Sequence, residues 1–243
     1  MTALPVSTPS PLIECRQLSV GYDAHAILPS ISLSIGASEF WAVIGRNGTG
    51  KTTWMRTLLG LMPPVSGAVR TRPDLRLAYV PQRSGLDELY PVLVREVVAM
   101  GQLRSWSFLR RQPARARERV QAALAEMRVA ELADEPFGRL SEGQKQRVLF
   151  ARLAVSDAHV AFLDEPTSAM DQVAEREAFR ALDTLREHHG LSIVIVSHYL
   201  GLAREFSDHA LFVDRDRETV LAGSRDEVFD SQLFRDRYAP GGD

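Results

Sequence analysis

The chain has 243 residues, 45% hydrophobic and 25% charged, which is typical of one large globular domain and excludes a disordered or collagen-like polypeptide. Lys and Arg total 29 and Asp and Glu total 31, so the net charge of −2 gives no general electrostatic reason to expect DNA binding. The single cysteine, Cys15, excludes a disulfide framework and a zinc site built from several cysteines.

Residues 1–11 are rich in Pro, Ser and Thr and lack the basic start and apolar core of a secretory signal. We therefore expect a flexible lead over 1–11 and a single domain over 12–243. Short alternating or apolar segments within it predict strands at 12–20, 31–35, 39–45, 75–80, 159–165, 191–198, 209–215 and 219–223. No apolar run approaches the ~20 residues of a membrane-spanning helix, so we expect no transmembrane segment.

Helical patterns alternate with these strands. Residues 50–61 predict a helix that ends before Pro63, residues 172–188 predict another, and a short helix is expected near the C-terminus. A mostly helical stretch covers about 91–155. The alternation predicts an α/β fold with a mainly parallel sheet, an inserted α-helical subdomain at about 91–155, and a flanking antiparallel β-subdomain formed by the first strands.

A glycine-rich segment between a predicted strand and a predicted helix fits the phosphate-binding pattern G-x-x-x-x-G-K-[ST]. It consists of Gly45, Arg46, Asn47, Gly48, Thr49, Gly50, Lys51 and Thr52. Glycines allow the backbone N–H groups of such a loop to surround phosphates, and the next helix adds the positive end of its dipole. Lys51 is expected to reach the β- and γ-phosphates and Thr52 to bind Mg²⁺. The alternative is a glycine turn beside a surface lysine.

Two neighbouring carboxylates, Asp164 and Glu165, follow the apolar segment 160–163. The end of such a strand is where open α/β sheets bind ligands. Asp164 can hold Mg²⁺ through its water shell, and Glu165 can polarise the attacking water. The pair alone also fits a strand followed by an acidic helix cap, but the phosphate-binding loop favours catalysis. Ser141 begins a strongly helical run, which predicts either a further anion-binding helix start or a plain capped helix.

These motifs occur in one order, with Gln82 after a strand, Ser168–Asp171 after the two carboxylates, and His198 after a later strand. In this order, over roughly residues 12–229, the chain resembles the ATP-binding cassette (ABC) family. The resemblance implies the P-loop ATPase version of the predicted α/β fold, with ATP and Mg²⁺ as cofactors.

The same resemblance implies roles for single residues. Tyr22 would stack on adenine, with a core tyrosine as the alternative, and Thr53 would join the phosphate-binding loop in holding ATP. Gln82 would contact Mg²⁺ and the attacking water, and His198 the γ-phosphate, which completes a catalytic set with Lys51 and Glu165. The signature motif, which contacts ATP on the other subunit, would be Ser141, Glu142, Gly143 and Gln144, and Asp171 would couple the two sites.

Partners also follow from the resemblance. Two copies of the chain would sandwich two ATP molecules head to tail and drive a separate permease from the cytoplasmic face of the inner membrane. An extracytoplasmic solute-binding protein would belong to the same system, and no nucleic-acid partner is expected. Glu142 departs from the family, which has glycine there. A carboxylate facing a γ-phosphate would be repelled, so we expect Glu142 to point away.

The run Tyr79–Gln102 and the Arg-rich stretch 104–119 are similar to the ATPases of bacterial importers of zinc, manganese or related divalent metals. Divalent-metal import is therefore the leading interpretation, iron-siderophore or haem import the alternative, and a soluble ABC ATPase a third. The Arg-rich stretch fits lipid or permease contact or a solvated helix face. The histidines show no ligand spacing, so no transition-metal site is predicted. Candidate permease contacts are Arg83, Leu86, Leu89, Tyr90, Val94 and Met100. The alternative for the apolar residues among them is ordinary packing inside the helical subdomain.

Overall fold

A computed structural model describes residues 10–82, 92–102, 114–167 and 170–238 of the chain. Its centre is a six-stranded sheet with the order β11-β10-β5-β9-β8-β7. Neighbouring described strands in it are parallel, except that β10 and β11 form an antiparallel hairpin. The strands are β5 (Phe40–Ile44), β7 (Leu77–Val80), β8 (Val160–Asp164), β9 (Ser192–Val196), β10 (His209–Asp214) and β11 (Thr219–Ser224).

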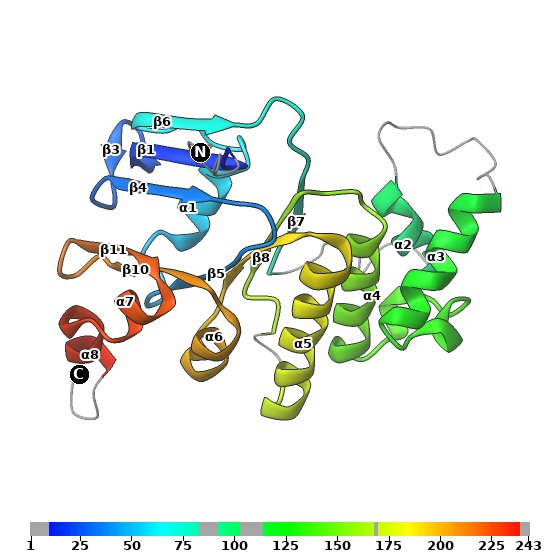
Figure 1. Cartoon of the computed structure of the whole chain (residues 1–243). Helices are drawn as coiled ribbons and strands as arrows, with labels where there is room; N and C mark the ends of the chain where they lie inside the picture. Colours follow the sequence, from blue (N-terminus) through cyan, green and yellow to red (C-terminus); the bar gives the residue numbers. More distant parts are fainter. Residues whose placement is uncertain (1–9, 83–91, 103–113, 168–169, 239–243) are drawn as a thin grey trace, which may run out of the picture.

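A second, antiparallel sheet lies over one side of the central sheet (Figure 1). Its strand order is β4 (Ile31–Ile35), β1 (Ile13–Ser19) and β6 (Ser66–Thr71). Helix α1 (Lys51–Leu58) joins the two sheets, because its Trp54 and Met55 share one buried apolar cluster with side chains of β1, β4 and β5. A two-stranded hairpin, β2 (Gly21–Tyr22) with β3 (His25–Ala26), completes this side.

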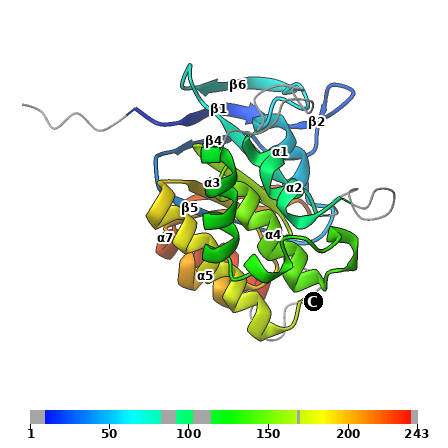
Figure 2. The same ribbon diagram turned by 90° about the vertical axis from the view of Figure 1, so that its right-hand side faces the viewer.

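Three helices gather at one end of the molecule (Figures 1 and 2): α2 (Val94–Ala99), α3 (Ala114–Glu126) and α4 (Glu142–Ala154). The 3₁₀ turns beside them are η1 (Met100–Gln102), η2 (Ala130–Leu132) and η3 (Phe137–Arg139). Helix α5 (Gln172–His189) packs between α4 and α6 (Leu200–Phe206), and α7 (Arg225–Phe229) and α8 (Gln232–Tyr238) close the opposite end. Thus helices cover the face of the sheet that α1 leaves uncovered.

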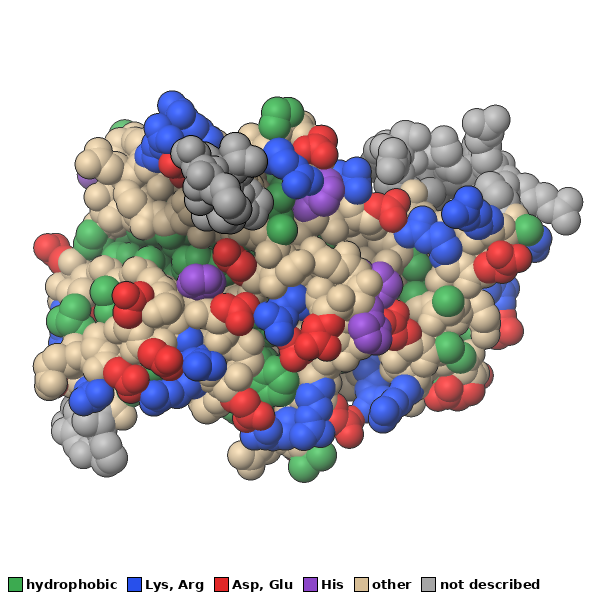
Figure 3. Space-filling view, viewed as in Figure 1, with side chains coloured by type: hydrophobic (Ala, Val, Ile, Leu, Met, Phe, Trp, Pro, Cys, Tyr) green, Lys and Arg blue, Asp and Glu red, His purple; other side chains and the backbone are tan. Residues whose placement is uncertain are grey.

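Burial explains why the central strands have continuous apolar sequences. Every residue of β5, β8 and β9 is buried, which is expected of parallel strands covered on both faces. On the surface in Figure 3, basic and acidic side chains are interspersed rather than gathered into broad areas of one sign. Ion pairs such as Arg176–Glu205 and Arg186–Asp208 tie α5 to its neighbours.

The predicted α/β fold, with a mainly parallel sheet and flanking antiparallel strands, is confirmed. Strand β6, the β2–β3 hairpin and α6 were not predicted. The division into a lead over 1–11 and one domain remains a prediction, and residues 1–9 lie outside the described residues. Among the residues that the structure describes, no helix has the length and apolar character needed to cross a membrane.

Candidate ATP site

The phosphate-binding loop connects β5 to α1, as its sequence predicts. Gly50 stands at the start of α1 with φ +99°, a left-handed conformation that favours glycine. A Cβ at Gly50 would also lie 2.9 Å from Cδ1 of Ile27. At the other end of the loop, a Cβ at Gly45 would lie 2.4 Å from the carbonyl oxygen of Val213 on β10. Gly45 is therefore required by the backbone that it faces, and Gly50 by its left-handed φ.

Lys51 is the buried cation of this loop, with a 5% exposed fraction. Its Nζ donates hydrogen bonds to the carbonyl oxygens of Gly45 at 2.8 Å and Arg46 at 2.7 Å. Burial lowers the pKa of Lys51, while the nearby charges of Glu165 and Asp164 act in the opposite direction. The ammonium group is thus held inside the loop rather than at the surface, which excludes the alternative of a surface lysine.

Asp164 ends β8 and lies beside the first turn of α1. It is 4% exposed, and its Oδ1 accepts a hydrogen bond from the Thr52 hydroxyl at 3.1 Å. Burial raises the pKa of Asp164, and the Thr52 hydrogen bond acts against that rise. The hydroxyl of Tyr79, on the neighbouring strand β7, lies 3.5 Å from Oδ2. The sequence analysis did not propose Tyr79 as a site residue. Its position near the end of β7, three residues before Gln82, could have indicated that it lies near the site.

The carboxylate of Glu165 is held on both oxygens. Gln82 Nε2 donates to Oε2 at 2.9 Å, and His198 Nε2 lies 2.6 Å from Oε1. Gln82 follows β7 and His198 follows β9, the two strands on either side of β8. The carboxyl ends of three adjacent parallel strands thus bring these residues together. Sequence reasoning placed all three residues at the site but did not predict that two of them would hold the third.

Tyr22 lies at the edge of the site. Its side chain is 54% exposed, so the alternative of a core tyrosine is wrong. Its hydroxyl lies 3.1 Å from Oγ1 of Thr53, which is on α1 two residues after Lys51. An exposed ring beside the phosphate-binding loop offers a flat surface on which a base can stack.

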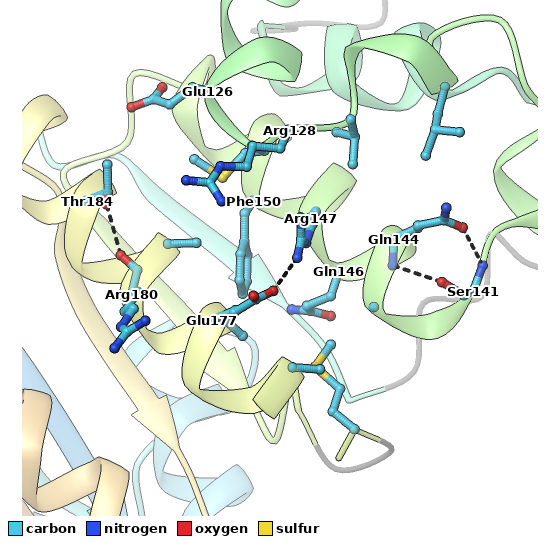
Figure 4. A pocket seen from close by; sticks show the side chains of 18 of the residues that line it. Glu126, Arg128, Ser141, Gln144, Gln146, Arg147, Phe150, Glu177, Arg180 and Thr184 are labelled. Carbon is cyan, nitrogen blue, oxygen red and sulfur yellow. Dashed lines mark hydrogen bonds and ion pairs between the residues drawn. The ribbon is translucent and has the colours of Figure 1, made fainter. Parts of the chain in front are cut away.

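The signature segment begins α4. Ser141 caps the helix: its Oγ accepts from the backbone N–H of Gln144 at 3.3 Å, and Gln144 Oε1 accepts from the backbone N–H of Ser141 at 2.9 Å (Figure 4). Glu142 is turned along its own helix, where Oε1 accepts from Lys145 Nζ at 2.9 Å. Asp171 caps α5 by accepting from the N–H groups of Val173 and Ala174.

The signature segment and the phosphate-binding loop border different pockets. A pocket of about 510 Å³ extends from Ser141 along α4 to Phe150 and is closed by α5 and the segment after α3 (Figure 4). A separate pocket of about 500 Å³ is lined by residues 46–49 and by Arg215 and Asp216. The two pockets share no lining residue: Ser141, Gly143 and Gln144 line the first, and residues 46–49 line the second.

Some sequence predictions fall elsewhere. Arg83, Leu86, Leu89 and Tyr90 lie outside the described residues, as do 103–113 of the Arg-rich stretch. Val94 is fully buried at the start of α2, so its prediction as a permease contact is wrong: the side chain packs inside the helical group. Near the C-terminal end of α5, the exposed His188 and His189 both contact Glu126 of α3.

The chain is similar in sequence and in fold to known proteins. The ABC transporter family model matches residues 28–168. The zinc import ATP-binding protein ZnuC of Cereibacter sphaeroides is 37% identical, over 84% of this chain and 79% of its own length. The protein of that name from Pseudomonas entomophila is 35% identical, over 92% of this chain and 82% of its own.

A solved structure has the same fold. CbiO1 from Clostridium perfringens, part of the ABC transporter complex cbiONQ, superposes with a TM-score of 0.76 and is 24% identical, covering 95% of this chain and 96% of its own. The family match covers more than half of the chain, and it includes the phosphate-binding loop and both carboxylates. The chain therefore belongs to the ABC transporter family as an ATP-binding subunit, and transport-coupled ATP hydrolysis is the general activity of that family.

Proposed function

We propose that this chain is the ATP-hydrolysing subunit of an importer of a divalent metal ion, with zinc as the first candidate. The catalytic part of the proposal rests on one observation: Glu165, clamped by Gln82 and His198, stands next in sequence to the Thr52–Asp164 pair. The choice of zinc rests on relatives of that name, which are 35–37% identical over most of the chain. Iron-siderophore or haem import is the competing outcome of the transport test below.

The donor atoms beside the loop suit Mg²⁺. Thr52 offers a hydroxyl oxygen, and Asp164 offers a carboxylate oxygen 3.1 Å away, and Mg²⁺ prefers such hard oxygen ligands. Gln82 has a side-chain oxygen left for the same role, because its nitrogen is engaged by Glu165. When bound, the ion would neutralise charge on the phosphates. Thr52, Gln82 and Asp164 are therefore the residues that would hold it.

The remaining chemistry belongs to the chain. The N-terminus of α1 and the Lys51 ammonium attract and orient the phosphates. Glu165 accepts a proton from the attacking water, and the Gln82 and His198 hydrogen bonds fix the direction in which its lone pairs point. Tyr22 supplies the stacking surface for adenine.

The separation of the two pockets supports a two-chain mechanism. Ser141, Gly143 and Gln144 line one pocket and residues 46–49 line another, so we infer that each nucleotide takes its signature segment from a second copy. A head-to-tail dimer with two-fold symmetry satisfies both sites at once. In it, Asp171 at the start of α5 would couple one site to the other.

The partners follow from the proposed role. An integral-membrane permease would hold the chain at the cytoplasmic face of the inner membrane, and an extracytoplasmic solute-binding protein would deliver the metal. Met100, which is partly exposed, remains a candidate for the permease contact.

The test uses a tagged Glu165→Gln chain, which should bind ATP, form a stable dimer and hydrolyse more than about 100-fold more slowly than the wild type. Purified from native membranes with ATP and Mg²⁺, it should carry a multi-span permease in stoichiometric amount. Lys51→Ala is the control that loses ATP binding itself. Recovery of soluble partners alone, with an intact ATP-dependent dimer, would reject the transporter role.

The transported solute needs its own measurement. Cells that lack the chain should lose uptake of radioactive zinc, and the wild type but not Glu165→Gln should restore it. Unchanged zinc uptake together with lost uptake of an iron chelate or haem would reject zinc and leave the ATPase assignment intact.

A further inference from the structure

One buried acid lies just behind the catalytic segment. Glu175, in the first turn of α5, has an exposed fraction of 0%. Its Oε1 accepts a hydrogen bond from the Thr167 hydroxyl at 2.9 Å. Its Oε2 is buried and has no hydrogen-bond partner among the residues that the structure describes. A fully buried carboxyl group with one unpartnered oxygen is costly if charged, and much less costly if that oxygen carries a proton.

The Thr167–Glu175 hydrogen bond joins the segment after Glu165 to the start of helix α5. Thr167 is two residues after Glu165, and its carbonyl oxygen accepts from the backbone N–H of Met170 at 3.0 Å. Glu175 is four residues after Asp171, to whose carbonyl oxygen its own N–H donates at 3.0 Å. The Thr167–Glu175 hydrogen bond therefore fastens residues 165–167 to the first turn of α5.

The surroundings favour the neutral acid. Burial raises the pKa of Glu175 to about 7, and the Thr167 hydroxyl acts against that rise. The charges of α5 near it pair outward, Arg176 with Glu205 of α6 and Glu177 with Arg147 of α4. Strand β9, also packed against α5, has no titratable residue. Other charged residues on the packed helices are Glu142, Lys145, Arg152 and Arg204, and none of these contributes to the pKa of Glu175.

We propose that Glu175 is a positioning residue whose protonated carboxyl group, through Thr167, holds residues 165–167 in the arrangement that hydrolysis requires. When Glu175 ionises, its buried Oε2 must either bind a water molecule or move outward. Either change loosens the first turn of α5 and the segment that carries Glu165. The proposal rests on the proposed roles of Glu165 and Asp171. It adds that the position of Glu165 depends on the protonation of Glu175.

The experiment measures kcat and KM for ATP hydrolysis by the full-length chain between pH 6 and pH 8.5. Glu175→Gln keeps the shape and the acceptor for Thr167 but cannot ionise. The ratio of kcat for Glu175→Gln to kcat for the wild type should rise about tenfold from pH 6 to pH 8.5, with KM unchanged. Using the ratio removes the pH effects of all groups that both proteins share.

Two further variants complete the design. Thr167→Val, which removes the hydroxyl, should lower kcat at every pH, because the link is lost in both protonation states. Glu177→Gln is the matched control: it changes a half-exposed carboxylate two residues along the same helix and should leave the wild-type pH profile unchanged. Melting temperatures at pH 6.5 check that each variant is folded.

The results of this experiment can be told apart from those that test the proposed function. Superimposable pH profiles of the wild type and Glu175→Gln would overturn the positioning role, as would a variant whose melting temperature changes while the kcat ratio stays constant. Full hydrolysis by Glu165→Gln would instead reject the catalytic assignment, whatever the profile of Glu175→Gln.

Discussion

Arg237 and Asp214 form an ion pair that is almost withdrawn from water, and it links helix α8 to the end of β10. Their side chains are 10% and 2% exposed, with 3.4 Å between Arg237 Nε and Asp214 Oδ2. Charges at this separation attract by about 5 kcal/mol at an effective dielectric constant of about 20. Removing water from both groups offsets much of that attraction, so the larger effect is expected when one partner is removed alone.

Arg237→Met removes the cation and keeps most of the side-chain volume. Among the described residues, Asp214 would retain Arg217, whose Nε is 3.9 Å away and whose backbone N–H donates to Oδ1 at 3.4 Å. The substitution also removes the pair of Arg237 with Asp216, which contributes little because the Asp216 side chain is 61% exposed. We expect a loss of about 3 kcal/mol in the free energy of unfolding, the low end for a broken buried pair. For a chain of this size the melting temperature should fall by about 6–12 °C. Thermal and urea unfolding followed by circular dichroism measure both quantities.

A second substitution separates the lost pair from the lost packing. In Arg237→Met with Asp214→Asn, no buried charge remains unpaired, so most of the stability should return. Arg235→Met is the matched control on the same helix, because Arg235 is 60% exposed and its pair with Asp230 is expected to contribute under about 1 kcal/mol. A fall of less than about 2 °C for Arg237→Met, or a double variant no more stable than the single one, would refute this reasoning.

Three further predictions concern the nucleotide site. Tyr22→Ala should raise KM for ATP about tenfold and Tyr22→Phe should not, since stacking needs the ring and not the hydroxyl; steady-state kinetics decide this. Gly50→Ala should fold but bind no ATP in calorimetry, because φ +99° and the 2.9 Å approach to Ile27 oppose a side chain; wild-type affinity would contradict it. Chelation of Mg²⁺ by EDTA should abolish hydrolysis, with full recovery on adding Mg²⁺; EDTA-resistant turnover would exclude the Thr52–Asp164 metal site.

Elements with strong local patterns were predictable from the sequence. The segment 31–35 alternates and forms β4 with the same bounds, and the apolar run 39–45 contains β5. Strand β6 was missed because most of its residues are exposed and show no alternation, so only its pairing with β1 defines it. Helix α6 was missed because it is short, contains Gly201 and follows a strand without a side-chain cap at Tyr199.

Some residues of the site were likewise predictable from the sequence and others were not. The loop 45–52, the Asp164–Glu165 pair and His198 are visible in the sequence, because each stands at the end of a recognisable strand. The contacts made by Glu175 and by Arg237 are not visible. A single acid in a helical pattern gives no sign of full burial, and Arg237 lies 23 residues from the aspartate with which it pairs. Tertiary packing alone brings such groups together.

The conformation of Glu165 shows why these hidden contacts matter. Its φ of +50° is left-handed, which costs a non-glycine residue about 1–2 kcal/mol and persists only where the surroundings hold it. Here the backbone N–H of Glu165 donates to Val196 at 3.2 Å, while Gln82 and His198 hold its side chain. On the C-terminal side, the Thr167–Glu175 contact fixes the chain two residues later. Strand β9, the end of β7 and helix α5 thus each constrain the same residue, so the direction of its carboxylate depends on all three, and a change in any one of them reaches the site of hydrolysis.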